Sequence, residues 1–135
     1  MLELLRRNKI FLVYTPLVLY WLLILTLTSL PSRSLPDVGI SDKISHFLAF
    51  FGLAVLLSLT FQFQEKWNKL KINYKIYTFW VVTLYGFLDE LHQLFIPGRS
   101  GTLDDWVADI IGGIIGIYFL EWFAKIDKKY SSFQK

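Results

Sequence analysis

The stretch IFLVYTPLVLYWLLILTLTSL, residues 10–30, decides the class of fold. It runs for twenty-one residues without a charged side chain, and about 20 apolar residues in a helix span the hydrocarbon core of a bilayer. Arg6, Arg7 and Lys9 precede it, as basic residues precede the apolar region of a secretory signal peptide. The stretch is longer than that region usually is, and no A-x-A-like cleavage site follows. The sequence therefore predicts a retained membrane span.

Three further apolar runs follow in a chain of 135 residues that is 54% hydrophobic and only 19% charged. They cover residues 44–63, 76–96 and 103–123. The four runs leave no room for another domain, and we find neither repeats nor low-complexity tracts. We predict an all-α fold, an integral membrane four-helix bundle that forms a single domain over residues 1–135.

The basic residues predict the orientation of this bundle. With the N-terminus inside, the inner segments hold eleven of the fourteen Lys and Arg residues, and the outer segments hold only Arg33, Lys43 and Arg99. The positive-inside rule therefore places both termini in the cytoplasm. The net charge of +3 follows from basic residues that set the topology and contact anionic lipid head groups. We therefore expect a lipid bilayer as partner and no nucleic acid. The absence of cysteine excludes disulfides and thiol chemistry.

Ionisable residues on three predicted helices fall at one depth of the membrane. Asp89 and Glu90 lie roughly 10 Å inside the outer end of the third span, at about 1.5 Å per residue, and Asp109 is about equally deep in the fourth. His46 follows Asp42 by one turn at the outer start of the second span. An ionisable group at the bilayer centre costs at least about 2.5 to 3.5 kcal/mol. We therefore expect these groups to share a protein interior.

Helical periodicity places the polar residues and several small residues on continuous faces. The faces are Gly86, Asp89, Glu90, Gln93 and Pro97; Asp105, Asp109, Gly112, Gly113 and Gly116; and Asp42, His46, Ala49, Phe50 and Leu53. The G-x-x-x-G motif of Gly112 and Gly116 predicts close approach of helices, within the chain or in a homodimer.

The acids of this region outnumber their potential partners. Six carboxylates face only Lys43, Arg99 and two histidines; they are Asp42, Asp89, Glu90, Asp104, Asp105 and Asp109. One interpretation is a buried ion-pair network that only fixes the bundle. Incomplete pairing instead favours a functional site, with some carboxylates protonated, solvated or bound to a cation.

The polar motifs resemble those of the VanZ-like family of small bacterial membrane proteins, whose founding member is associated with low-level teicoplanin resistance. The resemblance is carried by four motifs, which are Asp42-Lys43-Ile44-Ser45-His46-Phe47, Asp89-Glu90-Leu91-His92-Gln93, Pro97-Gly98-Arg99 and Asp105-x-x-x-Asp109-x-x-Gly112. It singles out Asp42, Lys43, His46, Glu90, Gln93, Arg99 and Asp105, and it implies a cell-envelope role in the bacterial cytoplasmic membrane. The family pattern commonly has Asn where this chain has Asp109.

Two functions from different classes fit these residues. The first is binding, without catalysis, of an envelope lipid, a wall precursor or a glycopeptide in an outward-facing polar pocket. Arg99 would grip a phosphate or carboxylate, Lys43 would add charge and Gln93 would orient the ligand.

The second is an intramembrane hydrolase or transferase acting on a phosphate-containing lipid. His46 would serve as base and Glu90 as acid, and Asp105 with Asp109 would hold a divalent cation, the one cofactor that the residues suggest. No serine elbow, cysteine nucleophile or H-E-x-x-H motif accompanies them, so binding is favoured over catalysis.

Overall fold

The computed structural model describes residues 1–34, 39 and 41–133, with side chains up to Lys128. All regular elements in these residues are helical. They are α1 (Leu2–Arg7), the π-helix η1 (Ile10–Tyr14), α2 (Thr15–Ser29), the 3-10 helix η2 (Ser32–Ser34), α3 (Asp42–Phe63), α4 (Asn68–Ile72), α5 (Tyr74–Gln93) and α6 (Leu103–Phe133). The prediction of an all-α fold is confirmed for this part of the chain.

Three helical segments among the described residues are long and apolar enough to cross a membrane, namely Ile10–Ser29, Asp42–Phe63 and Leu103–Lys128. They correspond to the first, second and fourth apolar runs. The third run forms α5, which ends at Gln93 rather than at Ile96 and does not meet the same test. The reason is composition, because α5 has 20 residues but carries Lys75 near its start and a group of polar residues at its end.

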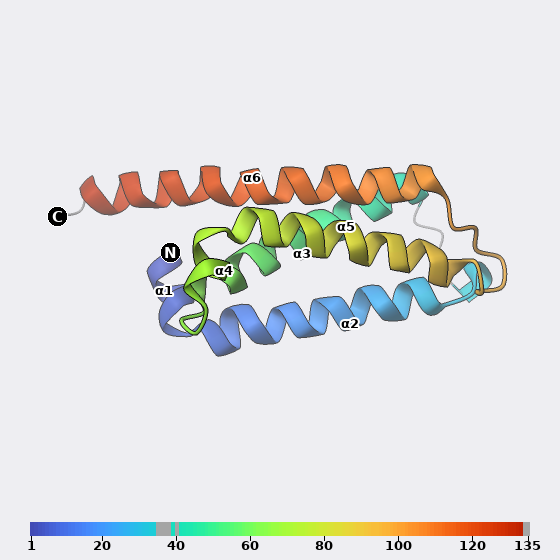
Figure 1. Cartoon of the computed structure of the whole chain (residues 1–135), viewed down its shortest axis with the longest axis horizontal. Coiled ribbons are helices and arrows are strands. Elements are labelled where there is room, and N and C mark those ends of the chain that lie inside the picture. The colour runs from blue at the N-terminus through green and yellow to red at the C-terminus, as the bar shows by residue number, and fades with distance from the viewer. Residues whose placement is uncertain (35–38, 40, 134–135) are drawn as a thin grey trace.

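Helix α3 is the centre of the packing, since it contacts α2, α5 and α6 along its length. Figure 1 shows α6 along one side and α2 along the other, with α5 in front of α3 between them and α6 extending beyond the other helices. The core between them is apolar and aromatic; its fully buried members include Phe50, Leu53, Ala54 and Val82. Large apolar side chains also cover the outer surface, as they do where helices face lipid.

Glycines let α6 lie directly against α3. A Cβ atom at Gly112 would collide with the backbone oxygen of Phe47, and one at Gly116 would lie 2.6 Å from the backbone oxygen of Phe51. Gly113 faces α5 instead, where a Cβ would lie 2.6 Å from Val82 Cγ1. The G-x-x-x-G motif thus serves packing within the chain, as small residues do between membrane helices. Homodimerisation stays a prediction.

The two ends of the molecule differ in chemistry. The N-terminus, α4 and the C-terminal part of α6 lie at one end (Figure 1), where Lys9 Nζ contacts Glu65 Oε1 at 2.8 Å and the N-terminal amine contacts Asp127 Oδ1 at 2.9 Å. The hydrogen bond from Lys9 holds the pKa of Glu65 below its ordinary value. At the other end the C-termini of α2 and α5 meet the N-termini of α3 and α6, and there the polar residues gather.

We expect Gly116→Leu to lower the thermal unfolding temperature of the detergent-solubilised protein by several degrees. The new side chain must displace the Phe51 backbone or separate α6 from α3, and such overpacking costs about 1 to 3 kcal/mol. Ile115→Leu, at a neighbouring position that is 45% exposed, is the control and should melt like the parent. Equal melting of the two variants would mean that α6 does not pack on α3 through its glycines.

Candidate functional site

The candidate site lies where three helix ends and one connection meet. The connection from Leu94 to Thr102 turns sharply at Gly98, whose φ of 77° is in the left-handed region that favours glycine. Gly101 then passes so close to the backbone oxygen of Glu90 that a Cβ atom there would collide with it. These two glycines bring the start of α6 back against the end of α5.

Thr102 caps α6 and ties it to α5. Its hydroxyl accepts from the Asp105 N–H at 3.2 Å and donates to Asp105 Oδ2 at 2.7 Å. Its own N–H donates to Glu90 Oε2 at 2.7 Å. Sequence reasoning missed Thr102, although Thr102-x-x-Asp105 has the spacing of a helix N-cap motif.

His46 of α3 stands at the centre of the site. Its Nδ1 lies 3.0 Å from Asp109 Oδ1 of α6 and 3.4 Å from Glu90 Oε1 of α5. All three side chains are buried, and Asp109 is 0% exposed. The predicted convergence of three helices on a shared polar interior is therefore confirmed for these three residues.

Two carboxylate oxygens of this buried group accept no hydrogen bond from the described residues. They are Glu90 Oε1 and Asp109 Oδ2. Asp109 Oδ2 fits against α5 only because Gly86 lacks a side chain, since a Cβ there would lie 2.8 Å away. Buried acceptors are normally paired, so open ones mark a place where an ion, water or ligand group can bind.

The structure gives Gln93 and Lys43 partners of their own. Gln93 Nε2 donates to Asp89 Oδ2 at 3.0 Å within α5, and both side chains are buried. Lys43 Nζ pairs with Asp104 Oδ2 at 2.8 Å on the exposed surface. Neither residue joins the His46 group.

Arg99 lies at the rim of the site with part of its hydrogen-bonding capacity unused. One guanidinium nitrogen donates to the Leu27 backbone oxygen at 3.3 Å, and the other lies 3.7 Å from Asp42 Oδ1, outside hydrogen-bond distance. Its Nε is buried and has no partner in the described chain. The side chain is 11% exposed.

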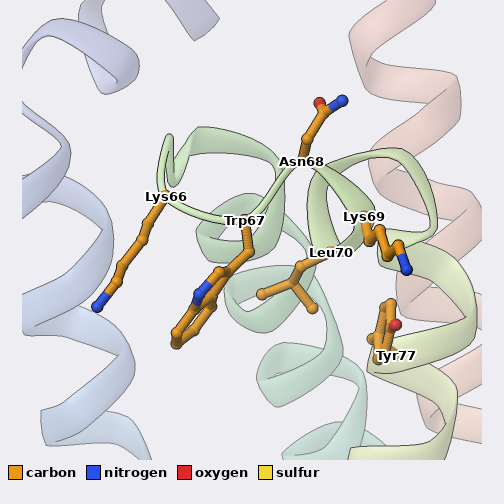
Figure 2. A pocket seen from close by; sticks show the side chains of 6 residues that line it. All are labelled: Lys66, Trp67, Asn68, Lys69, Leu70 and Tyr77. Carbon is orange, nitrogen blue, oxygen red and sulfur yellow. The ribbon is translucent and has the colours of Figure 1, made fainter.

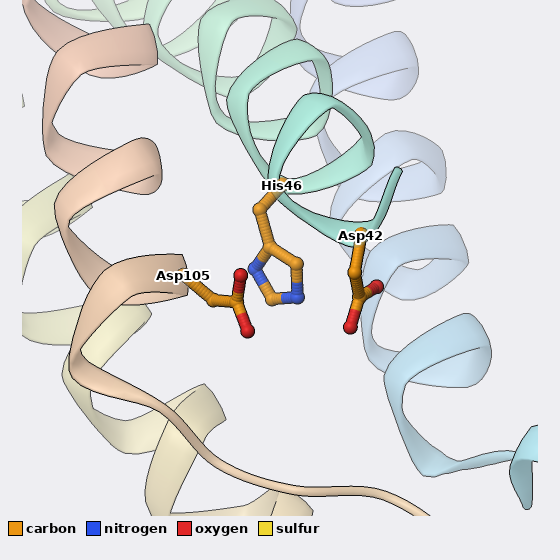
Figure 3. A group of neighbouring side chains, drawn as sticks. All are labelled: Asp42, His46 and Asp105. Carbon is orange, nitrogen blue, oxygen red and sulfur yellow. The ribbon is translucent and has the colours of Figure 1, made fainter. Parts of the chain in front are cut away.

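Among the described residues, two groups of side chains have the spacing of metal ligands, and both contain His46. In one, His46 joins Glu90 and Asp109; in the other, it joins Asp42 and Asp105 (Figure 3). Within each group the potential ligand atoms lie within 4.8 Å of one another. Asp105 and Asp109, the two acids expected to share a cation, thus belong to different groups.

A separate hollow of about 550 Å³ lies at the opposite end of the molecule, around α4. It is lined by Lys66, Trp67, Asn68, Lys69, Leu70 and Tyr77 (Figure 2). Lys66 Nζ lies 5.2 Å from the centre of the Trp67 ring. Tryptophan and lysine together are typical of helix ends at a membrane surface, so we do not assign this hollow a ligand.

Comparison with known proteins gives a family match over most of the chain. The family model described as VanZ/LLP1 matches residues 8–124, which include all of the candidate site. No curated protein and no solved structure matches the chain.

We expect Thr102→Val to destabilise the protein and Thr102→Ser to leave it nearly unchanged. Valine has the size of threonine but cannot cap α6 or donate to Asp105, and loss of an N-cap costs about 1 kcal/mol. Serine keeps the hydroxyl. Thermal unfolding in detergent measures the difference, and a valine variant as stable as the serine variant would show that the cap is not needed.

Proposed function

The chain belongs to the VanZ/LLP1 family, and from this premise we propose that it binds the head group of an envelope amphiphile and thereby contributes to envelope or antibiotic resistance. The ligand classes are an envelope lipid, a lipid-linked wall precursor or a glycopeptide. The protein is a multi-pass protein of the bacterial cytoplasmic membrane in this proposal, and its polar end faces outward.

The observation that carries the proposal is the burial of His46, Glu90 and Asp109 together, with two carboxylate oxygens that accept no hydrogen bond from the described residues. A network that only held helices together would gain most from complete pairing, because half-satisfied buried networks are costly. Ionisable residues inside membrane helices more often belong to functional sites.

Arg99 supplies the anion-binding part of the proposed site. Its planar guanidinium suits the two oxygens of a phosphate or carboxylate, and its contact with Asp42 at 3.7 Å is loose enough to be exchanged for a ligand. Phosphates and carboxylates are carried by the proposed ligand classes. Lys43 then belongs to the exposed surface beside the site, since it is paired with Asp104.

The arrangement of α5 supports a four-helix bundle. Helix α3 runs from the polar end to the end that holds the N-terminus and α4, and α6 starts again at the polar end (Figure 1). Helix α5 joins them and therefore covers the same distance in the opposite direction. Its polar residues Asp89, Glu90 and Gln93 are buried against other helices, so a fourth crossing need not expose them to lipid.

Catalysis is the alternative function that a specific contact favours. Asp109 holds His46 Nδ1 at 3.0 Å, and a carboxylate that orients an imidazole is the usual support of a general base. An intramembrane hydrolase or transferase acting on a phosphate-containing envelope lipid would use His46 in this way. Release of phosphate from such a lipid by the purified protein, lost in His46→Gln, would favour this alternative over binding.

We expect Arg99→Lys to abolish the envelope phenotype while the protein still folds, because lysine keeps the positive charge but lacks the planar guanidinium that can donate two parallel hydrogen bonds. The measurement is glycopeptide susceptibility of cells that express each variant at matched membrane levels. Arg33→Lys is the control, since Arg33 is exposed at the same end of the molecule. A retained phenotype, or a loss that follows a loss of thermal stability, would defeat the proposed role of Arg99.

The proposed orientation predicts that Ser100→Cys is labelled by an impermeant thiol reagent in intact cells and that Asn68→Cys is not. Both positions are exposed, at opposite ends of the molecule, and the parent chain contains no cysteine. Asn68→Cys should react only after the membrane is opened. The reverse pattern would invert the topology.

A further inference from the structure

The outer side of His46 is built like a metal site. Its Nδ1 contacts Asp109 Oδ1 at 3.0 Å, and an ionised carboxylate can only accept, so Nδ1 is the donor of this contact. In the neutral imidazole the lone pair is then on the other ring nitrogen, Nε2, which is the atom that a metal ion would bind. Metal-binding histidines are held in this way by a carboxylate on the nitrogen that does not bind the metal.

Two carboxylates flank the His46 ring. Figure 3 shows the His46 ring between Asp42 and Asp105, with Nε2 on the side of Asp42. One potential ligand atom from each of the three residues lies within 4.8 Å of the others. The His46 side chain is only 6% exposed, yet Nε2 has no hydrogen-bond partner among the residues that the structure describes. An imidazole nitrogen that has no partner in the described part of the chain and lies beside two acids has the chemistry of a metal ligand.

We propose that Asp42, His46 Nε2 and Asp105 bind one divalent transition-metal ion of the Zn²⁺ class. One imidazole and two carboxylates suit Zn²⁺ better than Mg²⁺ or Ca²⁺, which prefer oxygen ligands alone. Three protein ligands leave a fourth position of a tetrahedral ion open. This ligand set replaces the predicted pair Asp105 and Asp109. In the proposed site Asp109 does not bind the ion but orients the His46 ring through its contact with Nδ1.

The surroundings of the three ligands fit this assignment. Thr102 Oγ1 donates to Asp105 Oδ2 at 2.7 Å, which fixes that carboxylate and leaves its other oxygen for the ion. Asp42 is 54% exposed at the start of α3 and provides a path of entry. The inner group of His46, Glu90 and Asp109 is a poorer candidate, because its imidazole nitrogen is already used in the contact with Asp109.

The test is Zn²⁺ binding to the purified protein in detergent, after chelator treatment and with no envelope ligand added. We expect one Zn²⁺ per chain by titration calorimetry and a rise in the thermal unfolding temperature with Zn²⁺. Mg²⁺ at the same concentration should give neither effect. Because the assay contains no envelope ligand, its outcome is separate from that of the Arg99 experiment.

Asp42→Asn and Asp105→Asn should each weaken Zn²⁺ binding at least tenfold, because the amide removes the charge and keeps the shape. Asp104→Asn is the matched control, since Asp104 neighbours Asp105 but is 76% exposed and paired with Lys43. Asp109→Asn should weaken binding by about 10- to 100-fold, as loss of a group that orients a metal-binding histidine does. Asp42 is at an exposed helix start, so its variant tests the site even if a core variant fails to fold.

Absence of Zn²⁺ binding to the folded parent protein would overturn the proposal. Binding of equal strength in Asp42→Asn, Asp105→Asn and Asp104→Asn would also overturn it, because the ion would then sit elsewhere. Equal binding of Mg²⁺ and Zn²⁺ would contradict the role given to the imidazole.

Discussion

The contact between His46 and Asp109 is the interaction on which the polar end of the molecule depends. It joins α3 to α6 at 3.0 Å, and both helices are apolar enough to span a membrane, where an ionisable group that faces lipid is costly. The helices can come close enough for it because Gly112 and Gly116 remove side chains from the α6 face that meets α3. Gly86 on α5 makes the remaining space for the Asp109 carboxylate. Ionisable side chains between membrane helices are shielded from lipid only where the helix backbones lie almost in contact. The buried ionisable residues therefore depend on the glycines.

Local composition was sufficient to predict most of the fold. Twenty or so apolar residues in a row have few alternatives to a membrane helix, so three of the described helices that are long and apolar enough to span a membrane could be predicted from the sequence alone. Periodicity also predicted which face of α6 is buried, because Asp105, Asp109 and the three glycines do lie inside. The third predicted span, residues 76–96, is not among these three, because the polar residues at the end of α5 lower its mean hydropathy.

Pairing within the site could not be predicted in the same way. Periodicity gives a shared face but not the depth at which a neighbouring helix presents its own side chains. Asp105 and Asp109 are one turn apart, about 6 Å along the axis, which is enough to place them in different groups around the His46 ring. Lys43 and Gln93 were likewise expected to face the ligand, and the structure pairs them with Asp104 and Asp89. These outcomes depend on helix register, which only the assembled structure supplies.

Asp42 connects the two proposals made for the outer end of the site. Its carboxylate lies 3.7 Å from the Arg99 guanidinium and within reach of His46 and Asp105. A cation bound by Asp42 weakens the hold of Asp42 on Arg99 and leaves that guanidinium freer to bind an anion. An anion that draws Arg99 away makes Asp42 more available to the cation. Two ligands that compete for the same internal ion pair must favour each other's binding by equal factors. A phosphate-bearing ligand and a divalent cation would then bind this end of the protein more tightly together than either does alone.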